Sequence, residues 1–109
     1  MIFMNKYILI TTTFNNKKNL KKVTDILLER RLISCIQISK IKSKYFWKNK
    51  LVTSKEYLVK MKTRKDLYKK IENIILENHN YEVPEIICYD INDGNLKYLF
   101  WIDETTKEI

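Results

Sequence analysis

Apolar and polar positions alternate in two different rhythms along this chain, and their order predicts strands separated by helices. An apolar, β-favouring run over 7–11 predicts a first strand, and apolar side chains at helical spacing over 16–32 predict an amphipathic helix. Alternation then predicts a long strand over 33–47 and another over 56–62, joined through a polar turn at 48–50. The first half of the chain is therefore expected to form a strand, a helix and a hairpin.

The second half repeats the order of helix and strand. Apolar positions at helical spacing predict a helix over 64–78, and the segment 79–84 ends it because Pro84 lacks a backbone donor and restricts the residue before it. Residues 85–91 predict a fourth strand, and residues 95–103 predict a short C-terminal helix. A β-α-β-β-α-β order of this kind predicts an α+β, ferredoxin-like sandwich with an antiparallel sheet and two helices on one face.

The long strand over 33–47 changes phase along its length. Its apolar residues lie on even positions as far as Ile38 and on odd positions from Ile41 onwards. Because a slip of one residue moves every side chain to the opposite face, this pattern predicts a bulge or a change of neighbour near 39–41. The far half of the strand is expected to serve a different surface from the near half.

In this topology the second and fourth strands are the edges of the sheet. Cys35 and Cys88 then lie on opposite sides, beyond the ~7 Å that a disulfide allows. Unpaired edges invite association, and Tyr45, Phe46 and Trp47 lie near the far end of one edge strand. One sheet with two helices cannot cover all of these rings, so the pattern predicts that copies of the chain associate through them.

Length and charge narrow the class of protein. The chain has 109 residues, which fits a single domain over 1–109, and no apolar run reaches the roughly 18 residues that cross a bilayer. The first residues lack the pattern of a secretory signal, so we expect an intracellular, cytoplasmic protein. The net charge of +8 suggests nucleic acid or a membrane, but only three of 21 basic residues are Arg. We therefore predict neither partner.

The densest polar cluster places the single imidazole, His79, three residues before Glu82. Imidazole and carboxylate together can bind Zn, Cu or Ni, although this spacing matches no dedicated metal motif. In the alternative interpretation His79 ends a helix and donates to a carbonyl. Cys35 has the same ambiguity, since a thiolate is a soft metal ligand whereas a buried thiol behaves as a small hydrophobe.

Three further features bear on binding and catalysis. Glu56 and Lys62 share one face of a predicted strand, where they either line a groove or are solvated. Trp101 and the run Tyr45-Phe46-Trp47 can stack on a planar ligand. Large aromatic residues at the end of an edge strand or on a terminal helix more often anchor an interface. With one His, one Gly and no Ser elbow, the chain offers neither a catalytic triad nor a phosphate-binding loop, so we expect no enzyme and no organic cofactor.

Several motifs occur together in a fixed order and resemble the CutA family over about residues 7–103. The most specific is Tyr81-Glu-Val-Pro-Glu-Ile86, and the set is Thr11-Thr-Thr, Leu32-Ile-Ser-Cys35-Ile-Gln, Tyr45-Phe-Trp47, Val59-Lys-Met-Lys62-Thr63, His79-Asn-Tyr-Glu-Val-Pro-Glu-Ile86 and Gly94-Asn-Leu-Lys-Tyr-Leu-Phe-Trp101. The chain departs from the family pattern at Lys48, Asn49, Asn78 and Asn80.

The resemblance implies a homotrimer similar to PII-type signalling trimers, with a role in tolerance to divalent cations. It implies Cu²⁺ or another divalent cation in or near clefts between subunits, with His79, Cys35 and Glu82 as the expected metal ligands. The expected cleft positions are Trp47, Glu56, Lys62, Tyr81 and Trp101. The alternative is a PII-like regulatory or scaffolding trimer that binds a small anion or an unidentified partner protein without metal.

Overall fold

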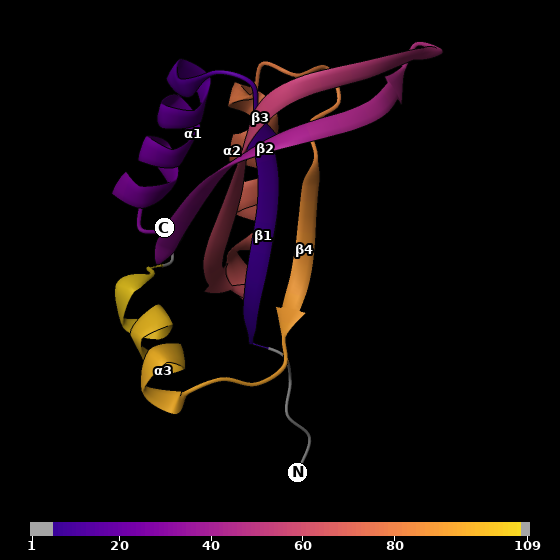
Figure 1. Ribbon diagram of the computed structural model, residues 1–109. Coiled ribbons are helices and arrows are strands. Elements are labelled where there is room, and N and C mark those ends of the chain that lie inside the picture. Colours follow the sequence, from indigo (N-terminus) through magenta and orange to yellow (C-terminus); the bar gives the residue numbers. More distant parts are fainter. Residues whose placement is uncertain (1–5, 108–109) are drawn as a thin grey trace.

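The computed structural model describes residues 6–107 and places helices against one sheet (Figure 1). The predicted β-α-β-β-α-β order and the C-terminal helix are both present. The elements are β1 Tyr7–Phe14, α1 Lys17–Glu29, β2 Cys35–Trp47, β3 Lys50–Arg64, the 3-10 turn η1 Lys65–Leu67, α2 Tyr68–Asn78, β4 Ile86–Ile91 and α3 Leu96–Thr105. Within residues 6–107, no helix has the length and apolar character that a bilayer crossing needs.

One face of the sheet and the apolar stripes of α1 and α2 form the core. Alternate side chains of β1 point to this face because successive side chains of a strand point to opposite sides, and the same holds for β3. The strands contribute Ile8, Ile10, Phe14, Val59 and Met61, and the helices contribute Leu20, Val23, Leu27, Ile71, Ile74 and Ile75. The opposite face is covered only at one end, where Tyr7 and Lys62 contact Asp103 and Tyr98 of α3.

Asparagine side chains start two of the helices. The side chain of Asn16 accepts a hydrogen bond of 2.8 Å from the backbone N–H of Asn19, and Asn95 accepts from the first turn of α3. These caps satisfy amide groups that have no partner inside the helix. Two polar residues that sequence alone marks as turn formers therefore fix where the helices begin.

The sheet is antiparallel with the strand order β2-β3-β1-β4, so β2 and β4 are its edges as predicted. Both cysteines are free thiols. β1 pairs with β3 only as far as Phe14 and Tyr57. Beyond that point residues 41–47 of β2 and 50–56 of β3 continue as a two-stranded ribbon, called the arm below, which projects from the body of the molecule (Figure 1).

The predicted bulge near 39–41 is wrong. The β2–β3 register runs without interruption from Cys35 opposite Lys62 to Trp47 opposite Lys50. The change of phase has another cause, because Ile36 packs against the core whereas Ile41 faces Leu9 and Leu58 on the opposite side of the sheet. The prediction that the far half serves a different surface is confirmed by the way the arm leaves the sheet (Figure 1).

The arm ends in a tight two-residue turn rather than the predicted three-residue one. Lys48 and Asn49 both have left-handed backbones, with φ of 49° and 64°. Two consecutive residues of this kind suit the twist of a hairpin, and Asn adopts the conformation readily. Lys50 is consequently the first residue of β3.

Candidate functional site

A cleft of about 750 Å³ lies between the arm and the segment that joins α2 to β4. Five of the residues predicted from the sequence line it, namely Tyr45, Trp47, Glu56, Tyr81 and Glu82. Tyr45 and Trp47 alternate with Phe46, which by strand geometry points to the opposite side of the arm. The predicted aromatic interface therefore divides between two faces of the arm.

Glu56 is the buried acidic group of this cleft. Its side chain lies on the same side of β3 as Lys62, as the alternation predicted, yet Glu56 is only 7% exposed. The phenol of Tyr81 donates a hydrogen bond of 2.5 Å to Oε2 of Glu56. Burial and this bond to the carboxylate raise the pKa of Tyr81 far above its ordinary value, so the phenol stays protonated and remains a donor.

His79 has a partner for each of its ring nitrogens. Nδ1 accepts from the backbone N–H of Tyr81 at 3.1 Å, and Nε2 lies 2.7 Å from the carbonyl oxygen of Thr13. Since a carbonyl only accepts, the proton is on Nε2 and the imidazole is neutral. The ring also stacks on Phe14, with centroids 4.4 Å apart and planes 8° apart. This geometry matches the interpretation of His79 as a structural donor to a carbonyl, although the carbonyl belongs to β1.

His79 gives a pH-dependent stability with a defined sign. Burial lowers its pKa below the ordinary 6.5, while the Thr13 carbonyl and the Glu56 carboxylate act in the opposite sense. Below pH 6.5 the imidazole binds a proton more readily in the unfolded chain than in the folded chain. The free energy of unfolding should therefore fall as the pH drops, and His79 should make no such contribution above that pH. Urea unfolding at about pH 7.5 and about pH 5 measures this fall. We expect a smaller fall in His79→Gln, and an equal one would contradict the assignment.

The three predicted metal ligands are not brought together in one chain. Cys35 lies opposite Lys62, which lies opposite Leu9, about 13 Å along β1 from the Thr13 carbonyl that holds His79. Within residues 6–107 no three His, Cys, Asp or Glu side chains gather closely enough to hold a metal ion. The described residues of a single chain therefore do not fit a metal site.

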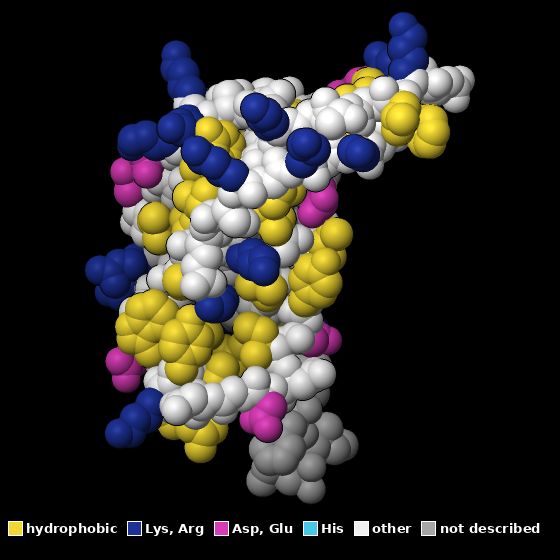
Figure 2. All heavy atoms as spheres, viewed as in Figure 1, with side chains coloured by type: hydrophobic (Ala, Val, Ile, Leu, Met, Phe, Trp, Pro, Cys, Tyr) yellow, Lys and Arg dark blue, Asp and Glu magenta, His cyan; other side chains and the backbone are white. Residues whose placement is uncertain are grey.

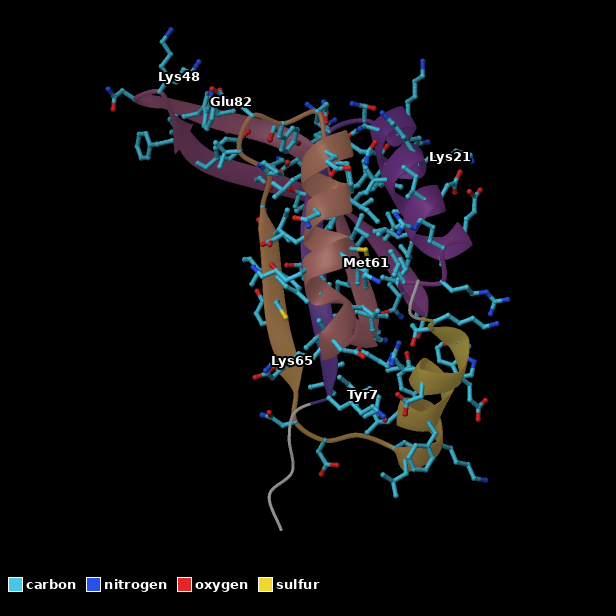
Figure 3. All side chains as sticks on the ribbon, turned by 180° about the vertical axis from the view of Figure 1, so that it is seen from behind. Tyr7, Lys21, Lys48, Met61, Lys65 and Glu82 are labelled. Carbon is cyan, nitrogen blue, oxygen red and sulfur yellow. The ribbon has the colours of Figure 1, made fainter. Side chains whose placement is uncertain are left out.

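Glu82 has a basic neighbour instead. Its carboxylate lies 4.0 Å from the ammonium of Lys48, and Figure 3 shows these two side chains beside each other at the arm. The same ammonium lies 5.7 Å from the centre of the Trp47 ring. Two residues that line the cleft, Glu82 and Trp47, thus have an ammonium group beside them.

The remaining predicted positions form a second group near the C-terminal end of β3. The ammonium of Lys62 lies 5.4 Å from the centre of the Tyr98 ring, which stacks on Trp101 at 5.6 Å. Cys35 is the cross-strand neighbour of Lys62. Sequence reasoning missed Tyr98, although a position three residues before Trp101 on a helix lies on the same face and could have indicated it.

Comparisons with known proteins identify the family. The family model described as CutA1 divalent ion tolerance protein matches residues 8–105. A divalent-cation tolerance protein CutA of Pyrococcus horikoshii is 39% identical over 93% of this chain and 99% of its own length. A chloroplastic CutA 1 of Oryza sativa is 36% identical over 93% of this chain, which spans 58% of that relative.

Solved structures agree with the sequence comparison. The crystal structure of CutA1 from Pyrococcus horikoshii has a TM-score of 0.88 at 38% identity, covering 93% of this chain and 99% of that one. CutA1 from a psychrotrophic Shewanella has a TM-score of 0.91 at 31% identity, covering 97% and 100%. With the family model matched over nearly the whole chain and the fold shared throughout, the chain belongs to the CutA1 divalent ion tolerance family.

Proposed function

We propose that the protein acts in divalent-cation tolerance as a homotrimer, without catalytic activity, and that cations bind where two copies meet. The observation that carries this proposal is the division of the site. The predicted residues form two groups at different positions along β3, one around Glu56 in the middle of the strand and one around Lys62 near its C-terminal end. Neither group is enclosed by its own chain, and pairing of the sheet edges between copies would bring one group against the other.

The cation site of this proposal draws its ligands from two chains. Cys35 supplies a thiolate from one copy and Glu82 a carboxylate from the next, a combination that favours Cu or Zn over Mg or Ca. His79 joins them only by giving up its bond to Tyr81 or to Thr13. Copper is the cation we expect first.

Calorimetric titration with copper tests the ligands. Cys35→Ser should weaken copper binding by about tenfold or more, because the thiolate is lost, while Cys88→Ser should bind like the wild type. Cys88 is a matched control, since it is the other free thiol and lies on the opposite edge of the sheet. Equal copper affinities for the wild type and both cysteine variants would show that Cys35 is not a ligand. Unchanged copper binding in His79→Ala would show that the imidazole is not a ligand.

We also propose a cellular location and an alternative function. A cytoplasmic location is expected, although relatives include a chloroplastic protein and one from Archaeoglobus fulgidus described as periplasmic. The alternative function, a regulatory trimer that binds a small anion or a partner protein, would use Lys62. In the described chain that ammonium faces Tyr98 rather than the acidic cleft.

A further inference from the structure

The one glycine of the chain, Gly94, directly follows an aspartate, Asp93. Both residues are exposed and belong to the segment 92–95, which joins β4 to α3 and forms neither helix nor strand. Figure 1 shows this segment crossing from the end of β4 to α3, at the opposite end of the molecule from the arm. The Asp93–Gly94 bond therefore lies apart from the cleft and is open to water.

The other aspartates of the chain are placed differently. Each lies within a helix, a strand or the 3-10 turn, and each is followed by a residue with a large side chain. They are Asp25 of α1, Asp66 of η1, Asp90 of β4 and Asp103 of α3. Regular structure fixes the backbone at these positions, and the next side chain hinders approach to its own amide nitrogen. At Asp93 neither restraint applies, because glycine has no side chain and a freer backbone.

The side chain of Asp93 is folded back onto the amide that follows it. The backbone N–H of Gly94 donates a hydrogen bond of 2.8 Å to Oδ1 of Asp93, so the amide nitrogen lies beside the carboxyl carbon that carries this oxygen. The turn itself does not require glycine. Gly94 has no left-handed backbone, and a Cβ there would meet the side chain of Leu99 at 3.4 Å, an ordinary contact. The fold therefore tolerates alanine at position 94.

We propose that Asp93–Gly94 is a site of spontaneous isomerisation, at which aspartate becomes isoaspartate through a cyclic imide. The Gly94 nitrogen attacks Cγ of the protonated Asp93 side chain and forms a C–N bond, and one carboxyl oxygen leaves as water with the amide proton and the carboxyl proton. Water then adds to one of the two imide carbonyls. Opening at Cγ restores aspartate, whereas opening at the backbone carbon leaves the chain running through Cβ and Cγ. The mass is unchanged, and neither metal nor trimer takes part.

The modified bond would act on α3. Isoaspartate adds a backbone atom just before Asn95, whose side chain accepts from the N–H groups of Lys97 and Tyr98 and so starts the helix. Only Leu99 and Ile102 of α3 are buried. Figure 2 shows hydrophobic side chains gathered on the surface at the place of α3, at the lower left. A helix with so little buried surface should be loosened when its cap is displaced.

Prolonged incubation of the folded protein in mildly acidic buffer, followed by peptide mapping, tests the modification. Cleavage after lysine leaves Asp90 and Asp93 in one peptide, 71–97. In the wild type this peptide should gain a second chromatographic form of unchanged mass, which accepts a methyl group from protein isoaspartate methyltransferase. Deamidation of asparagine changes the mass and is told apart in this way. Chains that carry isoaspartate should also unfold at a lower urea concentration than unmodified chains.

Three variants assign the new form to one bond. Gly94→Ala should lose most of it, because the added methyl group hinders the attacking nitrogen, and Asp93→Glu should lose all of it, because the longer side chain does not form the same imide. Asp90→Glu is the matched control and should keep the wild-type amount, since it makes the same change in the same peptide. Absence of the new form from the wild type, or an equal amount in Asp93→Glu and Asp90→Glu, would overturn the proposal. Equal urea midpoints for modified and unmodified chains would overturn its link to α3.

Discussion

Replacing Phe14 by alanine is expected to lower the free energy of unfolding by about 3–5 kcal/mol. Phe14 is fully buried at the end of β1 and belongs to the core that the sheet shares with α1 and α2. Its ring also stacks on His79, so truncation removes apolar contacts on one side and the support of the imidazole on the other. The cavity would open where the core meets the segment that forms one wall of the cleft.

Urea denaturation followed by circular dichroism measures this loss, with all proteins at one concentration because association would add to apparent stability. Phe100→Ala is the control, since it makes the same chemical change on α3 at a side chain that is 54% exposed. It should change the free energy of unfolding by less than about 1 kcal/mol. Equal losses for the two variants would contradict the role of Phe14 in the core.

The order of the elements could be predicted from the sequence because most helices and strands bury one apolar face against the same core. The helix stripes at Leu20 and Ile71 and the alternation through Val59 and Met61 each point to one core. The limits of β3 were harder to predict. Residues 50–55 show little apolar alternation, because they lie outside the core, and pairing with β2 keeps them extended. The change of phase in β2 has a similar origin, since its two halves face different surroundings and no bulge is needed.

The candidate site was predictable in its residues and less so in its contacts. The resemblance indicated Glu56 and Tyr81 as cleft positions, and the structure joins them by a hydrogen bond between residues 25 positions apart. His79 bonds to a carbonyl 66 positions away, which no local pattern specifies. Its suitability as a metal ligand depends on whether its nitrogens are already engaged, and only the folded arrangement shows that they are.

Placing charge at the tip of the arm is expected to abolish the proposed trimer. Phe46 and Leu51 lie directly opposite each other there and are 76% and 67% exposed. They are too far along the arm to reach their own core. If neighbouring copies cover them, burial of Phe46 alone stabilises each contact by about 1.5–3 kcal/mol, and symmetry repeats that contact in all three copies, for a total of roughly 5–9 kcal/mol.

The double variant Phe46→Lys with Leu51→Lys should therefore elute as a folded single chain of 13.3 kDa, whereas the wild type should show three times that mass by light scattering. Leu76→Lys provides the control, since it introduces a lysine at a side chain on α2 that is 53% exposed, and it should leave the mass unchanged. Circular dichroism should be the same for all three proteins, because no residue that is changed lies in the core. A double variant that stays trimeric would show that the arm tip is not buried between copies. A wild type of single-chain mass would refute the trimer itself, since the exposed rings of the arm would then have no neighbour to cover them.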